Sequence, residues 1–283
     1  MITRRIGLTA LAASLASACS PLSMFATFTP KDRARSEGRG LAYGEGERRK
    51  LDIYGPPVPG TAPVAVFLYG GSWDSGRRGD YGWAGRAIAA QGFVTVVPDY
   101  RVYPETRFPG FVEDCAQAVR WVVGNIARYG GDPSRIVLIG HSAGAYNAAM
   151  LALDRRWLTA AGVDPTVVKA FAGLSGPYAF LPLDGPITQR TFGEVADLPA
   201  TQPAVYARAD APAAFLATGE ADDFVRPRNT VRLAAALRDA GAKVEERHYA
   251  GLNHTDTVLA LSRPLRGKAP ILADMTAFLK AYL

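Results

Sequence analysis

The chain has 283 residues, of which 48% are hydrophobic and 20% are charged. This composition excludes a disordered polymer, and the length suits one α/β domain with a large buried core. The formal net charge is +6, but no basic stripe carries interleaved aromatic residues, which excludes a typical nucleic-acid-binding protein.

The first residues have the pattern of an export signal. Arg4 and Arg5 precede thirteen mostly apolar residues, too few to cross a bilayer as a helix. The stretch "LASAC" resembles a bacterial lipoprotein box, so we expect removal of residues 1–18 and a lipid on Cys19, with a signal cut at an ordinary small-residue site as the alternative. This pattern predicts an exported protein of the periplasm or cell envelope, held at the membrane by a lipid anchor.

The segment between Lys31 and Lys50 mixes charges of both signs. Such mixing predicts a solvated tether followed by a first hairpin. Attraction to an anionic membrane surface is the alternative. We therefore expect a tether over residues 19–40 and a catalytic domain over residues 41–283.

Predicted strands and helices alternate along the rest of the chain. Short, often continuously apolar runs predict strands at residues 49–55, 62–71, 92–101, 135–142, 168–176, 211–220 and 243–251. Helical patterns lie near residues 80–91, 109–129, 143–153, 227–241 and 270–282. This order predicts an α/β fold with a mostly parallel central sheet and helices on both faces. In such a sheet, functional residues are expected at the C-terminal ends of the strands.

The stretch "GHSAG" places Ser142 between a predicted strand and a predicted helix. A turn of this kind holds the serine in a strained, exposed position, and Gly140 and Gly144 leave room for closely packed backbone. Ala143 begins the helix, so its N–H group points toward whatever Ser142 attacks. A serine in an ordinary glycine-rich turn is the alternative to a nucleophile.

A nucleophilic serine requires a base, and the base requires a group that orients it. Of the three histidines, His141 is expected to be a packing residue and His248 to lie on a strand face. His254 follows the last predicted strand in a loop, and it is the predicted base. Chain order places the acid before it, and we prefer Asp222 to the neighbouring Asp223, which is expected to be solvated or to cap a turn.

A serine that attacks a carbonyl carbon also needs backbone N–H groups aimed at the carbonyl oxygen as it becomes negative. The stretch "FLYGGSW" ends an apolar strand in two glycines, so the N–H groups of Gly71 and Ser72 are expected to join that of Ala143. A plain Gly-Gly turn is the alternative. The histidines and cysteines show no metal-ligand spacing, so we expect neither a metal nor another cofactor, and Cys115 is predicted to be a small core residue of a helix.

Together these motifs resemble those of α/β-hydrolases. "FLYGGSW", "VVPDYRVYPETRFP", "YGGDPSRIVLIGHSAGAY", "LSGPY", "TGEADDFV" and "GLNH" occur in the order of the carboxylesterase and lipase group. They are most similar to its branch of arylformamidases, isoprenylcysteine methylesterases and feruloyl-esterase-like enzymes, from about Tyr43 to the C-terminus. The resemblance implies the following roles: Ser142 as nucleophile, Asp222 as orienting acid, His254 as base, and Gly71, Ser72 and Ala143 as oxyanion donors.

The sequence departs from that group in one motif. The usual "HGG" is "YGG", with Tyr69 in place of histidine, which changes the hydrogen bonding behind the oxyanion donors. "GHSAG" rather than "GDSAG" also separates the chain from the branch that resembles hormone-sensitive lipase.

The proline-rich segment 178–210 predicts a short lid rather than a second domain. Trp73, Tyr178, Phe180 and Phe224 are candidates to line a substrate pocket, with a plain core role as the alternative for each. We therefore expect a serine carboxylesterase for a small, partly aromatic ester. The alternatives are an arylformamidase-like amide hydrolase and a non-catalytic, membrane-anchored binding protein on the same fold, against which the complete Ser, Asp and His set argues.

Overall fold

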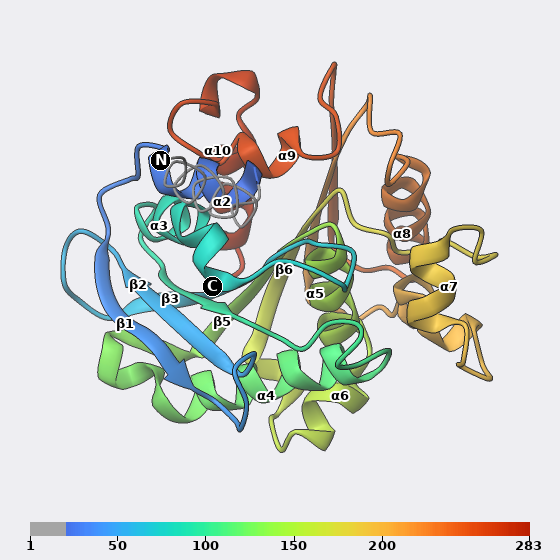
Figure 1. The fold of residues 1–283 in the computed structure, drawn as a ribbon, viewed down its shortest axis with the longest axis horizontal. Helices are drawn as coiled ribbons and strands as arrows, with labels where there is room; N and C mark the ends of the chain where they lie inside the picture. The colour runs from blue at the N-terminus through green and yellow to red at the C-terminus, as the bar shows by residue number, and fades with distance from the viewer. Residues whose placement is uncertain (1–20) are drawn as a thin grey trace, which may run out of the picture.

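The computed structural model describes residues 21–283, and one eight-stranded sheet forms its centre (Figure 1). The strands are β1 (Arg35–Ala42), β2 (Lys50–Gly55), β3 (Ala62–Leu68), β4 (Val94–Pro98), β5 (Gly131–His141), β6 (Val168–Leu174), β7 (Ala213–Gly219) and β8 (Val244–Tyr249). Their order across the sheet is β1-β2-β4-β3-β5-β6-β7-β8. β2 is antiparallel to both of its neighbours, and β3 to β8 are parallel, which leaves β1 and β8 as the edges.

Helices cover both faces of the sheet. The α-helices are α2 (Pro21–Phe28), α3 (Gly82–Ala89), α4 (Gly110–Asn125), α5 (Ala143–Leu153), α6 (Arg155–Ala160), α7 (Pro186–Phe192), α8 (Arg228–Asp239), α9 (Asp256–Leu259) and α10 (Ile271–Lys280). The 3₁₀ helices are η1 (Arg78–Tyr81), η2 (Ile126–Tyr129), η3 (Pro165–Val167), η4 (Pro199–Thr201), η5 (Pro203–Tyr206) and η6 (Arg266–Lys268). α3 and α10 pack together on one face, and α4, α5 and α6 pack against one another on the other.

The predicted fold class is confirmed by this arrangement. β4 and β7 are buried along their whole length, as continuous apolar strands must be when helices cover both faces. α5 begins and ends where the sequence pattern places it. Cys115 is fully buried in α4 and has no disulfide partner among residues 21–283, in agreement with its predicted core role.

The structure differs from the prediction in the tether. Part of it, from Pro21 onward, forms α2 and most of β1, and α2 packs with the Phe25 ring 5.3 Å from the Trp83 ring. The predicted first hairpin is present, because β1 pairs with β2. Sequence analysis gives this hairpin no bounds for β1, because β1 is a half-exposed edge strand in which charges and glycines replace an apolar run.

The predicted lid, residues 178–210, contains α7, η4 and η5 (Figure 1). Cys19 and the rest of the predicted export signal lie outside the described residues. None of the helices over residues 21–283 has both the length and the apolar character that a membrane crossing needs.

Candidate active site

Ser142 lies at a sharp turn between β5 and α5. Its backbone has φ 54° and ψ −123°, a strained conformation for a residue other than glycine. The flanking glycines are required by close backbone contacts, since a Cβ atom on Gly144 would lie 2.0 Å from the carbonyl oxygen of Leu68. A Cβ atom on Gly140 would likewise lie 2.2 Å from the carbonyl oxygen of Gly144. The sequence thus forms the predicted strand–turn–helix.

Three side chains from separate parts of the chain meet at this turn. The Oγ atom of Ser142 lies 2.9 Å from Nε2 of His254, and Nδ1 of His254 lies 2.9 Å from Oδ2 of Asp222. A carboxylate only accepts, so Nδ1 carries the proton and Nε2 is free to accept from the serine hydroxyl. This geometry lets a serine hydroxyl lose its proton to an oriented imidazole.

Asp222 is held in a well-defined environment. Its Oδ1 atom accepts from the N–H groups of Phe224, at 3.2 Å, and Val225, at 2.8 Å. The Asp222 carboxylate also receives a hydrogen bond from the Ser175 side chain. Burial opposes ionisation, but the His254 hydrogen bond and charge and the bonds from Val225 and Ser175 outweigh it, so the pKa of Asp222 lies below its ordinary value. Asp222 is therefore a carboxylate at neutral pH.

The two other histidines lie in different places. His248 is on β8 and its Nε2 atom is 2.7 Å from Oε1 of Glu246. His141 is 4% exposed, in keeping with a packing residue, but its Nε2 atom is also 3.1 Å from the backbone oxygen of His254. Sequence analysis missed this contact because it joins residues 113 positions apart.

The predicted oxyanion loop follows β3. Gly71, Ser72 and Trp73 have φ values of 138°, 53° and 56°, so three successive residues are left-handed. The carbonyl oxygen of Gly71 accepts from the N–H groups of Asp74 and Ser75, each at 3.0 Å, which closes a tight turn. Ser72 and Ala143 line the cavity at Ser142, whereas Gly71 does not line it.

Tyr69 replaces the expected histidine and forms its own polar anchor. It is fully buried, and its hydroxyl donates to Oδ1 of Asp99 at 3.0 Å. Burial and the adjacent Asp99 raise the pKa of Tyr69 well above its ordinary value, so it remains a hydrogen-bond donor. The hydroxyl of Tyr100 in turn donates to the carbonyl oxygen of Tyr69 at 2.6 Å. Tyr69 is therefore hydrogen-bonded through both its hydroxyl and its carbonyl oxygen.

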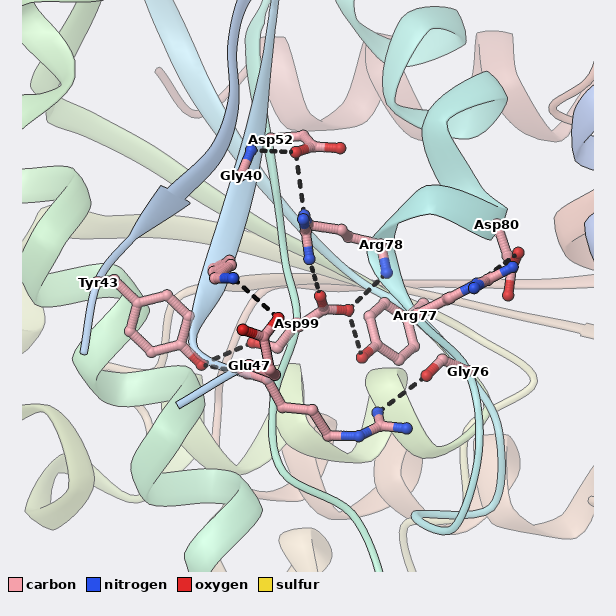
Figure 2. Close-up of polar contacts among 12 residues, drawn as sticks. Gly40, Tyr43, Glu47, Asp52, Gly76, Arg77, Arg78, Asp80 and Asp99 are labelled. Carbon is pink, nitrogen blue, oxygen red and sulfur yellow. Dashed lines mark hydrogen bonds and ion pairs between the residues drawn. The ribbon is translucent and has the colours of Figure 1, made fainter. Parts of the chain in front are cut away.

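Asp99 also ties the end of the oxyanion loop to the sheet (Figure 2). Asp99 accepts from the backbone N–H group of Arg78 at 2.6 Å and also forms an ion pair with the Arg78 guanidinium. The Nε atom of that guanidinium lies 3.0 Å from Oδ1 of Asp52. Arg48 donates to the carbonyl oxygen of Gly76 at 3.0 Å. These contacts connect the segment after the oxyanion loop to β2 and to the end of β4.

A cavity of about 360 Å³ opens at Ser142. Trp73 and Phe224 line it, as predicted, and so does Phe180. Tyr178 does not: it is fully buried, its ring packs against Gly176, and its hydroxyl has no partner among the described residues. Two larger hollows, of about 460 and 580 Å³, do not include Ser142, and charged side chains line most of the second.

The lid forms one wall of the cavity through the start of α7. Ile187 lines the cavity, and Phe192 at the end of α7 is fully buried. The Phe192 ring lies 5.0 Å from the Trp73 ring and 5.3 Å from the Phe180 ring. An ion pair between Arg190 and Asp74 joins the lid to the oxyanion loop. The lid is thus packed into the core as well as covering the site.

No group of three or more His, Cys, Asp or Glu side chains suited to a metal ion occurs among residues 21–283. The polar partners that sequence analysis did not identify are Ser175, Asp99 and Arg78, which no local motif marks as part of the site.

The sheet order, with Ser142 at the turn after β5 and Asp222 and His254 on later loops, defines an α/β-hydrolase. Esterase B from Lactobacillus rhamnosis has this fold, with a TM-score of 0.82 and 18% identity over 97% of this chain and 96% of the other. The hyperthermophilic esterase from the archaeon Pyrobaculum calidifontis matches with a TM-score of 0.70 and 22% identity, over 95% and 90% of the two chains.

The chain belongs to the BD-FAE family, whose model matches residues 51–237. Its curated relatives include the probable isoprenylcysteine alpha-carbonyl methylesterase ICMEL1 of Oryza sativa subsp. japonica, 34% identical over 81% of this chain and 59% of the relative. Esterase LipQ of Mycobacterium tuberculosis is 32% identical over 84% of this chain and 61% of LipQ. The chain thus spans about three fifths of the length of these relatives. The predicted resemblance to the carboxylesterase and lipase group is confirmed for family and fold.

Proposed function

We propose that the protein is a serine carboxylesterase that hydrolyses small acyl or aryl esters. The observation that carries this proposal is the hydrogen-bonded line from Ser142 through His254 to Asp222, with 2.9 Å at each step. Its relatives' names, which include methylesterases and an esterase, support the same class of reaction.

The mechanism follows from the positions of these groups. His254 takes the hydroxyl proton of Ser142 while Oγ attacks the acyl carbon, and Asp222 keeps the imidazole in the tautomer that accepts this proton. The N–H groups of Ala143 and Ser72, which line the cavity, stabilise the oxyanion of the tetrahedral intermediate, whereas a contribution from Gly71, which does not line it, stays a prediction. The protonated His254 then gives its proton to the leaving alcohol, and a water molecule hydrolyses the acyl-enzyme by the same route.

The cavity supports a small substrate. Its volume of about 360 Å³ falls at the lower end of the usual range for ligand sites. Trp73, Phe180 and Phe224 provide aromatic walls, which favour an ester with a short alkyl or single-ring acyl group.

The test is hydrolysis of p-nitrophenyl acetate and butyrate, with a formanilide in parallel. We expect Ser142→Ala to lower the ester kcat at least about 10³-fold, while the exposed Ser134→Ala keeps the wild-type rate. Faster turnover of the formanilide would instead identify an arylformamidase-like amide hydrolase. A folded protein that turned over neither substrate would favour the non-catalytic binding protein or a different substrate admitted past the lid.

We propose in addition that the protein is exported and anchored by a lipid on Cys19, on the basis of the N-terminal sequence pattern. The test is cell fractionation of the full chain beside Cys19→Ala. The wild type is expected in the membrane fraction and the variant in the soluble fraction. Equal membrane association of both would reject the anchor.

A further inference from the structure

His141 contacts three parts of the site at once. It is the last residue of β5 and precedes Ser142. Its ring centre lies 5.0 Å from that of His254, and a Cβ atom on Gly70 would lie 2.9 Å from its Nδ1 atom. The imidazole therefore fills the space between the turn at Ser142, the oxyanion loop and the loop that carries His254.

His141 makes its polar contact with the main chain of His254. Its Nε2 atom lies 3.1 Å from the carbonyl oxygen of His254, and because a carbonyl only accepts, Nε2 carries the proton. Nδ1 has no partner within residues 21–283. The hydroxyl of Thr257 donates to the same carbonyl at 3.0 Å and lies 3.1 Å from the Ser175 hydroxyl.

This carbonyl belongs to the residue whose side chain must bridge Ser142 and Asp222. The side chain of His254 has hydrogen bonds at both ring nitrogens, and its main chain is fixed by His141 on one side and Thr257 on the other. A catalytic imidazole is effective only when it stays within a few tenths of an ångström of its productive position. The two donors to the carbonyl restrict the position of the His254 backbone.

The ionisation state of His141 is consistent with a fixed donor. Burial, and secondarily the neighbouring His254, lower the pKa of His141 to about 3, whereas Asp222 acts in the opposite sense. His141 is therefore neutral over the pH range in which serine esterases are assayed, and its single N–H remains on Nε2.

We propose that His141 is a positioning residue, which holds the backbone of His254 through its Nε2–H group so that the imidazole stays aligned with Ser142. The proposal rests on the proposed esterase function. It assigns a specific task to the histidine of "GHSAG", which sequence analysis treated as packing.

The test compares two amides that differ by one methylene group. His141→Gln places an amide N–H group near the position of Nε2, whereas the side chain of His141→Asn ends near Nδ1, where the structure has no partner. We expect His141→Asn to lower kcat for p-nitrophenyl acetate at least about tenfold with KM within about twofold, and His141→Gln to retain kcat within about threefold. The exposed His248→Gln is the matched control and keeps the wild-type kcat.

Thr257→Val removes the other hydrogen bond to the carbonyl oxygen of His254. We expect it to lower kcat without raising KM, and to add little to His141→Asn in the double variant because both act on one group. If His141→Asn does not fold, His141→Gln decides the case, because the proposal requires this variant to keep kcat within about threefold of the wild type. Equal kcat in the Asn and Gln variants, or a change confined to KM, would overturn the proposal. A wild-type protein without Ser142-dependent ester hydrolysis would instead reject the proposed function.

Discussion

Asp222 and Asp223 are neighbours in the sequence but lie in different environments. Asp222 is 3% exposed and holds Nδ1 of His254, whereas Asp223 is exposed. Asp222→Asn offers His254 an amide that donates as well as accepts, so the imidazole is no longer kept in the required tautomer. We expect kcat for p-nitrophenyl acetate to fall about 10²- to 10⁴-fold in Asp222→Asn and less than about threefold in Asp223→Asn.

The test is the difference in kcat between Asp222→Asn and Asp223→Asn. Equal losses in both would assign the orienting role to the charge of the loop rather than to Asp222. Circular dichroism and the midpoint of thermal unfolding control for folding, because Asp222 also accepts the N–H groups of Phe224 and Val225.

Sequence reasoning was strongest for residues whose place is fixed by backbone geometry. Ser142, Asp222 and His254 come together because each follows a strand of one parallel sheet, and those strand ends share one edge. The prediction that Tyr178 lines the substrate pocket is wrong. No sequence pattern indicates whether an aromatic ring near a site faces the cavity or the core. The contact of His141 with His254 depends on the exact packing of two loops, which no short motif encodes.

At the scale of elements, the central parallel strands were predictable because their apolar runs reflect burial on both faces. The bounds of β1 were not predictable in this way, since β1 has a single neighbouring strand and a mixed charge pattern. α7 was also missed, as it is a short helix of seven residues that begins at Pro186 within a proline-rich segment. It is held by tertiary packing rather than by its own helical tendency.

The packing of α7 makes a measurable prediction. Phe192 is fully buried among Trp73, Phe180 and Tyr146, so Phe192→Ala removes contacts to all three rings. We expect a loss of about 3–5 kcal/mol in the free energy of unfolding, measured by urea denaturation. Phe28→Ala is the matched control: its side chain is 79% exposed and the change is expected to cost less than about 0.5 kcal/mol. A similar small loss in both would mean that the lid is not part of the core.

For the molecule as a whole, the burial of His141 affects stability against acid. Its pKa is lowered from 6.5 to about 3 in the folded protein. Below pH 6.5 the unfolded chain binds a proton at this residue and the folded protein does not, so acidification favours unfolding. The effect is absent above pH 6.5, grows as the pH falls, and amounts to at most about 3 kcal/mol at pH 4.

His141→Gln removes this titration. We expect the free energy of unfolding to fall less between pH 7 and pH 4 in the variant than in the wild type, as measured by urea denaturation at each pH. All other groups titrate in both proteins, so the difference between the two curves reports His141. Parallel curves would show that the buried imidazole accepts a proton without unfolding the protein.

The two edge strands of the sheet, β1 and β8, affect whether a strand from another molecule can pair with the sheet. β1 carries an Arg35–Glu37 ion pair and register shifts along its length, and β8 carries an Arg247–Glu245 ion pair. Charged side chains and an irregular backbone hinder the addition of a strand from another chain. Addition of a strand at either edge is therefore disfavoured, which lowers the tendency of concentrated or freshly synthesised protein to grow edge to edge into fibres.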